Sequence, residues 1–190
     1  MSPISTCDEL PHAVAGASAR LTVSQQRQTP DPARHEGPRV DATMTIHTAR
    51  FGELEIDEKL IVHFPDGIMP FGKNLDFALL VDVDDSPTAW LQSLQYPELA
   101  FWAGHAAKLF PEHEINIDRH HIKLMQTGEP EQLCVLVIIS IQDGKPVANL
   151  LAPILLNIDQ GVGRQIILSG NLDLVRVPVS VEALAAGQPA

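Results

Sequence analysis

The sequence holds one cluster of side chains that could bind a metal ion. Four histidines fall within seventeen residues, with three carboxylates among them: His105, His113, His120, His121, Glu112, Glu114 and Asp118. Three imidazoles and a carboxylate form a ligand set that zinc accepts. The spacing matches no recognised zinc pattern, and a solvated His-rich loop explains the cluster more simply. A metal- or small-ligand-binding barrel using the His105/His113/His120 region is therefore the second hypothesis for function.

Other catalytic patterns are incomplete. Cys134 sits in the apolar run LCVLVII, where a thiol is usually inert, and the sequence contains no G-x-S-x-G motif. The stretch GVGR, residues 161–164, lacks the third glycine of a phosphate-binding loop and reads better as a turn. Asp82, Asp84 and Ser86 alternate as in a calcium loop, but the glycine and the terminal glutamate are missing. We expect no enzyme and no cofactor.

The aromatic pair Phe101-Trp102 raises the possibility of a binding surface. Neighbouring residues of a strand face opposite sides, so an outward Trp102 could anchor a protein partner. The alternative is that both rings are buried between the barrel wall and a covering segment. Trp102 is kept as a candidate partner-binding residue.

The amino-acid composition argues against several classes of binding partner. The chain has 190 residues, 45% of them hydrophobic, and a formal net charge of −11, which opposes direct contact with nucleic acid. Its two cysteines, Cys7 and Cys134, form no disulfide framework and suit a reducing cytoplasm. The apolar runs are too short to span a membrane, and the N-terminus does not resemble a signal peptide.

Residues 1–43 differ from the rest. They are rich in Pro, Gln and Arg and show no hydrophobic period, which predicts a disordered extension. One alternative is that the natural chain starts at Met44 and that the extension is a start-site artefact. The charge lies in residues 44–190, which hold 9 basic and 19 acidic residues against 4 and 5 in the extension. We expect a folded domain over residues 44–180 and a frayed C-terminus over residues 181–190.

Residues 44–180 read as about nine or ten short strands between turns. TIHTAR, ELEI and KLIVHF are followed by the turn cluster PDGIMPFG, and Asp143-Gly144 is a strong type I′ hairpin signal. HAAKLF could form one or two helical turns, and DRHHIKLM a short helix or a strand. The unbroken apolar run after Pro153 predicts a strand that is buried on both faces. RQIILS and LDLVRVPV are expected to be the last strands. The fold class is all-β, a single compact antiparallel β-barrel-like domain with one or two short helical turns.

Three segments in order resemble the flagellar assembly factor FliW family. IVHFPDGIMPF is similar to that family's F-x-x-G-I-x-G-F turn, with Pro70 where the family usually has Gly. SPTAWLQSLQYPELAF resembles its S-P-F-x-x-L-Q-S segment, and NLLAPILLNI followed by GRQIIL resembles its N-L-x-A-P strand. The matched positions, which we expect to be structural, are Phe64, Gly67, Ile68, Phe71, Leu91, Gln92, Ser93, Phe101, Asn149, Pro153, Asn157 and Gln165.

The resemblance implies a cytoplasmic β-barrel protein that chaperones flagellin. When free of flagellin, such a protein binds CsrA, a small RNA-binding translational repressor, and relieves repression. The partners implied are therefore flagellin and a CsrA-type regulator, with no direct nucleic acid and no membrane. The acidic run Asp82, Asp84 and Asp85 could help attract a basic repressor, or it could only keep a loop solvated.

Overall fold

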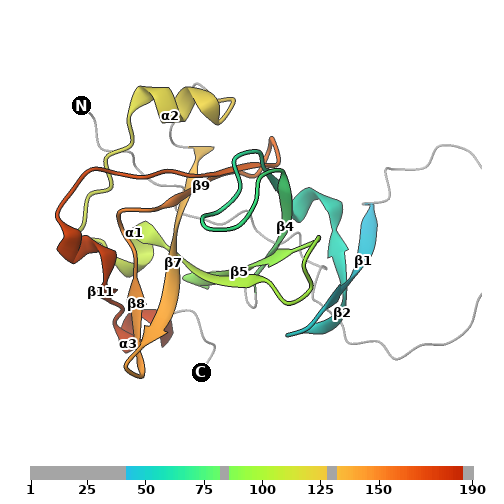
Figure 1. Ribbon diagram of the computed structural model, residues 1–190, viewed down its shortest axis with the longest axis horizontal. Coiled ribbons are helices and arrows are strands. Elements are labelled where there is room, and N and C mark those ends of the chain that lie inside the picture. Colours follow the sequence, from blue (N-terminus) through green and yellow to red (C-terminus); the bar gives the residue numbers. More distant parts are fainter. Residues whose placement is uncertain (1–41, 82–85, 128–131, 186–190) are drawn as a thin grey trace, which may run out of the picture.

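The computed structural model describes residues 42–81, 86–127 and 132–185, and the expected disordered extension falls almost wholly outside these ranges. Eleven strands and a few short helices make up this part of the chain (Figure 1). The strands are β1 (Thr43–Thr48), β2 (Gly52–Asp57), β3 (Ile61–Phe64), β4 (Leu75–Leu80), β5 (Thr88–Ser93), β6 (Ala100–His105), β7 (Cys134–Gln142), β8 (Lys145–Ala148), β9 (Ile154–Asn157), β10 (Val162–Gln165) and β11 (Val177–Pro178). The helices are η1 (Glu58–Leu60), α1 (Ala106–Leu109), α2 (Arg119–Leu124), η3 (Leu172–Val175) and α3 (Val181–Ala185).

Seven of the strands close into a barrel. They follow the order β7-β6-β5-β4-β3-β10-β9, and a further pairing of β7 with β9 closes the ring. All these neighbours are antiparallel except β3 and β10, which run parallel at the pair His63 and Val162. Strands β8 and β11 extend the sheet beyond β7, while β1 and β2 form a separate hairpin. The expected all-β barrel is confirmed, with this parallel pair as the difference from a purely antiparallel one.

The barrel is filled by alternate side chains of its strands. Phe64 and Phe77 are fully buried and meet edge to face with their ring centroids 5.2 Å apart. The cluster around them consists of Val62, Ile68, Leu75, Leu79, Ala89, Leu91, Ala103, Cys134, Leu136, Ile154 and Leu156. Gly163 faces Phe64 so closely that an added Cβ would lie 2.4 Å from the ring. The ring of Phe64 on β3 therefore leaves room only for a glycine at position 163 of β10.

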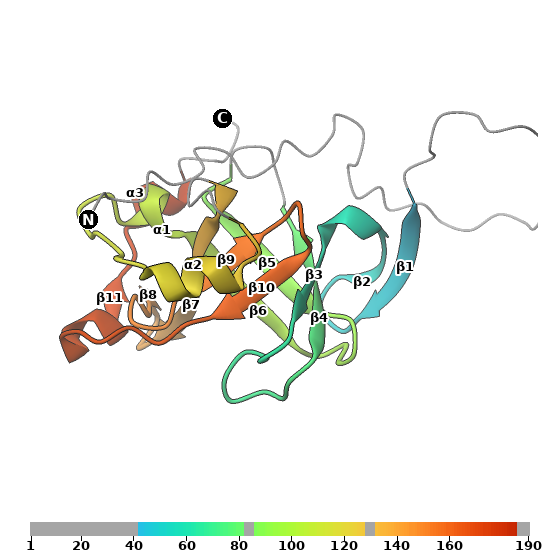
Figure 2. The ribbon, with the colours of Figure 1, turned by 90° about the horizontal axis from the view of Figure 1, so that it is seen from above.

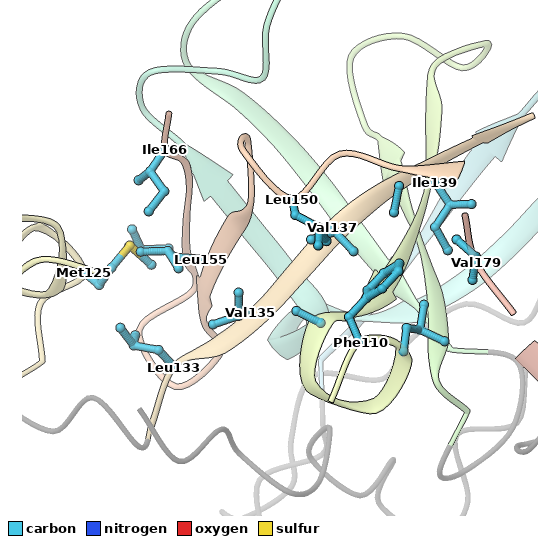
Figure 3. Close-up of a cluster of buried hydrophobic side chains, with 14 residues drawn as sticks. Phe110, Met125, Leu133, Val135, Val137, Ile139, Leu150, Leu155, Ile166 and Val179 are labelled. Carbon is cyan, nitrogen blue, oxygen red and sulfur yellow. The ribbon is translucent and has the colours of Figure 1, made fainter. Parts of the chain in front are cut away.

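A second core lies on the outer side of β7 and β9. Figure 3 shows Val135, Val137 and Leu155 with Phe110 and Met125, which come from the segments around α1 and α2. Because β9 faces the barrel interior with one side and this cluster with the other, all four residues Ile154–Asn157 are buried. This confirms the expectation that the apolar run after Pro153 forms a strand buried on both faces.

The β1–β2 hairpin packs against the barrel from the side, next to β4 (Figure 2). Ile46 and Ile56 are buried on its inner face, in contact with Ala78 of β4. Next to Thr48, at the tip of the hairpin, the Ala49 amide donates to the Pro97 carbonyl at 2.9 Å. This hydrogen bond attaches the tip to the turn between β5 and β6. The hairpin therefore belongs to the same packed unit as the barrel.

Two expected strands are shorter in the structure. β10 ends at Gln165, although three apolar residues follow it in RQIILS, because its next partner, Pro153, has no amide to return a hydrogen bond. The Ile166 amide still donates to the Pro153 carbonyl at 3.0 Å. The segment LDLVRVPV forms η3 and the two-residue β11, since the Asn171 side chain accepts from the Asp173 amide and starts a turn.

Other local predictions are confirmed. Asp143 and Gly144 have φ of 50° and 74° and connect β7 to β8 as the expected two-residue turn. HAAKLF contains the one-turn helix α1, and DRHHIKLM forms the helix α2. Helix α3 occupies Val181–Ala185, inside the segment expected to fray. Within the described residues, no helix is both long and apolar enough to cross a membrane.

Candidate functional site

The structure separates the histidines of the candidate metal site. His105 ends β6 and is 1% exposed, whereas His113 lies in the loop after α1 and His121 lies in α2. Each of the latter two pairs with its own carboxylate, His113 with Glu112 at 3.1 Å and His121 with Asp118 at 2.9 Å. No group of three or more His, Cys, Asp or Glu side chains in the described ranges could hold a metal ion.

The pair of Asp118 and His121 has a structural explanation. Asp118 is the N-cap of α2, and its carboxylate accepts from the His121 backbone amide at 2.9 Å. This backbone hydrogen bond, helped by the nearby imidazole of His121, lowers the pKa of the Asp118 carboxyl. The arrangement begins a helix, and it does not need a bound ion.

The acidic run is outside the described residues. Asp82, Asp84 and Asp85 fall in the segment that connects Val81 to Ser86, between β4 and β5. The partner-binding role expected for them therefore stays a prediction, and an experiment is needed to test it.

Trp102 takes part in an aromatic surface cluster that joins β5, β6 and the tip of the β1–β2 hairpin. Its ring stacks on that of Trp90, its partner across the strands, with centroids 6.3 Å apart and planes 20° apart. Phe51 meets Trp90 edge to face at 5.6 Å, and the Arg50 guanidinium lies 4.1 Å from the Trp90 ring centroid. Trp102 is half-buried, so the hairpin covers part of the cluster and solvent reaches the rest.

This cluster contains three residues that the sequence analysis did not single out, Arg50, Phe51 and Trp90. Arg50 and Phe51 lie in a turn about forty residues before Trp90. At that distance along the chain, no local sequence pattern indicates the contact. Tryptophan and arginine are enriched among the residues that dominate protein interfaces. The structure thus adds Arg50 and Trp90 to Trp102 as candidates for partner contact.

The amide side chains of the family motif hold turns and connections, Asn157 between distant segments and Asn149 within its own turn. The Gln92 amide donates to the carbonyls of Ser93, Pro97 and Leu99 at 3.1–3.2 Å and so holds the β5–β6 turn. Asn157 donates to the Met125 carbonyl at 2.9 Å and ties the end of α2 to the barrel. Asn149 accepts from the Leu151 amide at 3.0 Å.

The loop between β3 and β4, residues 65–74, projects from the end of these strands (Figure 2). It is held by hydrogen bonds on both sides and yet presents apolar side chains to solvent. Ile68 is buried in the barrel, and Phe71 packs on Phe101 with ring centroids 5.3 Å apart. Met69 remains 68% exposed and Phe71 41% exposed. Among the family-motif positions, Phe71 is therefore a surface residue as well as a packing one, and Met69 beside it is a candidate contact that the sequence analysis did not single out.

Gln165 of β10 fixes the middle of this loop. Its side-chain oxygen accepts from the Met69 amide at 2.8 Å, and Arg164 pairs with Asp66 nearby. We expect Gln165→Leu to change global stability by only about 1 kcal/mol, because water can replace an exposed hydrogen bond. Amide exchange should nevertheless become clearly faster at Met69 and stay unchanged at Gly67, whose amide donates to Phe64 at 3.1 Å. Equal exchange at Met69 in both proteins would show that Gln165 does not hold the loop.

Comparison with known proteins gives one consistent family. The profile of the family described as FliW protein matches residues 45–179. The flagellar assembly factor FliW of Geotalea uraniireducens is 30% identical over 71% of this chain and 83% of that protein. FliW of Geobacillus thermodenitrificans is 35% identical over 66% of this chain and 88% of that protein. A solved structure described as the crystal structure of the flagellar assembly factor FliW is 31% identical and covers 71% of this chain and 94% of that chain, with a TM-score of 0.61.

Proposed function

Because the chain belongs to the FliW family of flagellar assembly factors, we propose that it binds flagellin and, when free, a CsrA-type translational repressor. Binding the repressor would prevent it from blocking flagellin synthesis. Unsecreted flagellin would then occupy the assembly factor and release the repressor, so that synthesis follows export. In this role the protein is a cytoplasmic chaperone and regulator rather than an enzyme.

The observation that carries the proposal is the family match across the whole barrel, residues 45–179. The charge of the folded part is consistent with it. Residues 44–190 carry 19 acidic and 9 basic side chains, and an RNA-binding repressor must be basic where it meets phosphate. An acidic protein docked beside that site would attract the repressor and would disfavour incoming RNA.

The direct test is capture of partners by the purified chain. The full chain is immobilised and exposed separately to purified flagellin and to a purified CsrA-type protein, and binding is then repeated with both present. We expect each to bind alone and flagellin to reduce binding of the repressor. Recovery of neither partner would contradict the proposal.

Which acidic groups act on the repressor can be tested separately. If Asp82, Asp84 and Asp85 contribute, changing all three to Asn should weaken repressor binding several-fold at low salt and should flatten its salt dependence. The matched control removes exposed carboxylates of β2 instead, through Glu53→Gln and Glu55→Gln. An unchanged affinity and salt slope for the triple variant would show that the acidic run only keeps its loop solvated. Trp102 is proposed as an apolar contact of the same complex.

A further inference from the structure

A groove of about 540 Å³ lies between the segment that precedes α2 and the chain around β9 and β10. Its apolar lining consists of Ile115, Leu150, Leu151, Ile167, Leu168 and Leu174. Leu150 is buried, whereas Ile167 is 60% exposed. Large exposed aliphatic side chains beside an apolar depression are typical of protein docking sites.

The floor of the groove is already assembled. The Leu168 amide donates to the Leu151 carbonyl at 2.8 Å, and the Leu150 amide donates to the Leu174 carbonyl at 2.8 Å. These bonds join the segment before β9 to the segment between β10 and β11, and Leu150, Leu168 and Leu174 also pack in the second core. A partner would therefore meet a preformed surface and would not need to order it.

The groove has an acidic border. Three of its lining residues are carboxylates, Glu112, Glu114 and Asp118, and none is a lysine or an arginine. Glu112 and Asp118 are each 63% exposed at the side chain, and each is also in contact with a lining histidine, His113 or His121. A charged partner could therefore reach both carboxylates without burial, but it would share them with these imidazoles. The combination of an apolar floor with an acidic border selects a segment that is apolar on one side and basic at its edges.

We infer that this groove binds a basic amphipathic helix of a partner protein. Apolar side chains spaced at i, i+3, i+4 and i+7 enter the groove, and lysines or arginines beside them meet the carboxylates of the border. A second copy of this chain fits poorly because its net charge is −11. Residues 1–43 of the same chain also fit poorly, because they hold 4 basic and 5 acidic residues.

The inference rests on the proposed function in one respect, that this chain is a binding protein. The probe is a fluorescent peptide of about 18 residues, with leucine along one helical face and lysine elsewhere. Two further peptides serve as controls, one with glutamate in place of lysine and one with the same residues in scrambled order. Anisotropy of each peptide is measured against the full chain. We expect saturable binding of the first peptide and at least about ten-fold weaker binding of the others.

Substitutions in the groove test whether the peptide binds there. Ile167→Ser should weaken binding about five-fold, and Glu112→Gln with Glu114→Gln should weaken it several-fold and reduce its salt dependence. Ile141→Ser is the matched control, because Ile141 is also 60% exposed but lies on β7 outside the groove. Equal effects of Ile141→Ser and Ile167→Ser, or equal binding of the scrambled or acidic peptide, would overturn the inference.

Failure here is separable from failure of the proposed function. If the unaltered chain captures flagellin or the repressor while the peptide does not bind, the groove inference fails and the proposed function stands. If the peptide binds at Ile167 but neither purified partner is captured, the groove stands and the proposed partners are wrong.

Discussion

Replacing Gln92 by Glu is expected to destabilise the folded chain by about 3–5 kcal/mol at pH 7, although the change replaces only an NH₂ group by oxygen. Gln92 is 0% exposed, and its NH₂ group donates to three backbone carbonyls at 3.1–3.2 Å. A carboxylate in that position would face three carbonyl oxygens without a donor. It would also lose its hydration, which costs more than the loss of the hydrogen bonds alone.

The pH dependence of this variant distinguishes a buried charge from a simple packing defect. Burial raises the pKa of the introduced carboxyl above its unfolded value of about 4.3, so the folded state holds the proton to higher pH. Between these two pKa values the folded state binds more protons, and the free energy of unfolding therefore falls as pH rises. Below pH 4.3 this penalty disappears, although the carboxyl then has one donor hydrogen for the three carbonyls where the amide has two.

Urea unfolding of the variant from pH 4 to pH 8 measures this slope. Gln160→Glu is the control, because Gln160 is exposed and a new carboxylate there remains solvated. We expect the control to follow the unaltered protein at every pH. A Gln92→Glu variant whose loss of stability does not change with pH would contradict the role given to the Gln92 amide.

Much of the barrel follows from local sequence signals. Alternation located β1 and β2, and the turn pair Asp143-Gly144 located the β7–β8 hairpin. The unbroken apolar run after Pro153 correctly indicated a strand buried on both faces, because β9 separates two cores. In each case the signal and the structure it specifies lie within a few residues of one another.

The remaining features depend on contacts between distant segments. The pairing of β7 with β9 closes the barrel, and β3 meets β10 in parallel about one hundred residues later in the chain. Neither pairing has a local signature. The same holds for the candidate surfaces, since Arg50 reaches Trp90 from another hairpin and the groove gathers Leu150, Leu168 and Leu174 from two separate connections. The histidine cluster shows the opposite case, in which closeness in sequence did not bring the side chains together.

Replacing Gly67 by alanine is expected to have the second large effect on stability, and Gly52 provides the matched comparison. Both have φ of 73°, a conformation that costs an L-residue with a Cβ about 1–2 kcal/mol. Their surroundings differ. A Cβ on Gly52 would meet nothing within 4 Å, whereas a Cβ on Gly67 would lie 1.8 Å from the Gly72 carbonyl oxygen. Because that obstacle is backbone, the loop of residues 65–74 cannot accept the Cβ by rotating a side chain.

Gly67→Ala is therefore expected to lose about 2 kcal/mol more stability than Gly52→Ala, since overpacking adds about 1–3 kcal/mol to the cost of positive φ. The displaced Gly72 should also move Phe71, whose ring packs on Phe101 at 5.3 Å and whose exposed edge stands beside Met69. Urea midpoints of the two alanine variants give the difference in stability, and amide exchange at Phe71, whose amide donates to the Ile68 carbonyl at 2.7 Å, reports the loop itself. Equal losses in both variants would mean that the loop relaxes around the added methyl group. A larger loss in Gly67→Ala, with faster exchange at Phe71, would mean that the glycine of the family motif is required by a backbone contact and not by the φ angle alone.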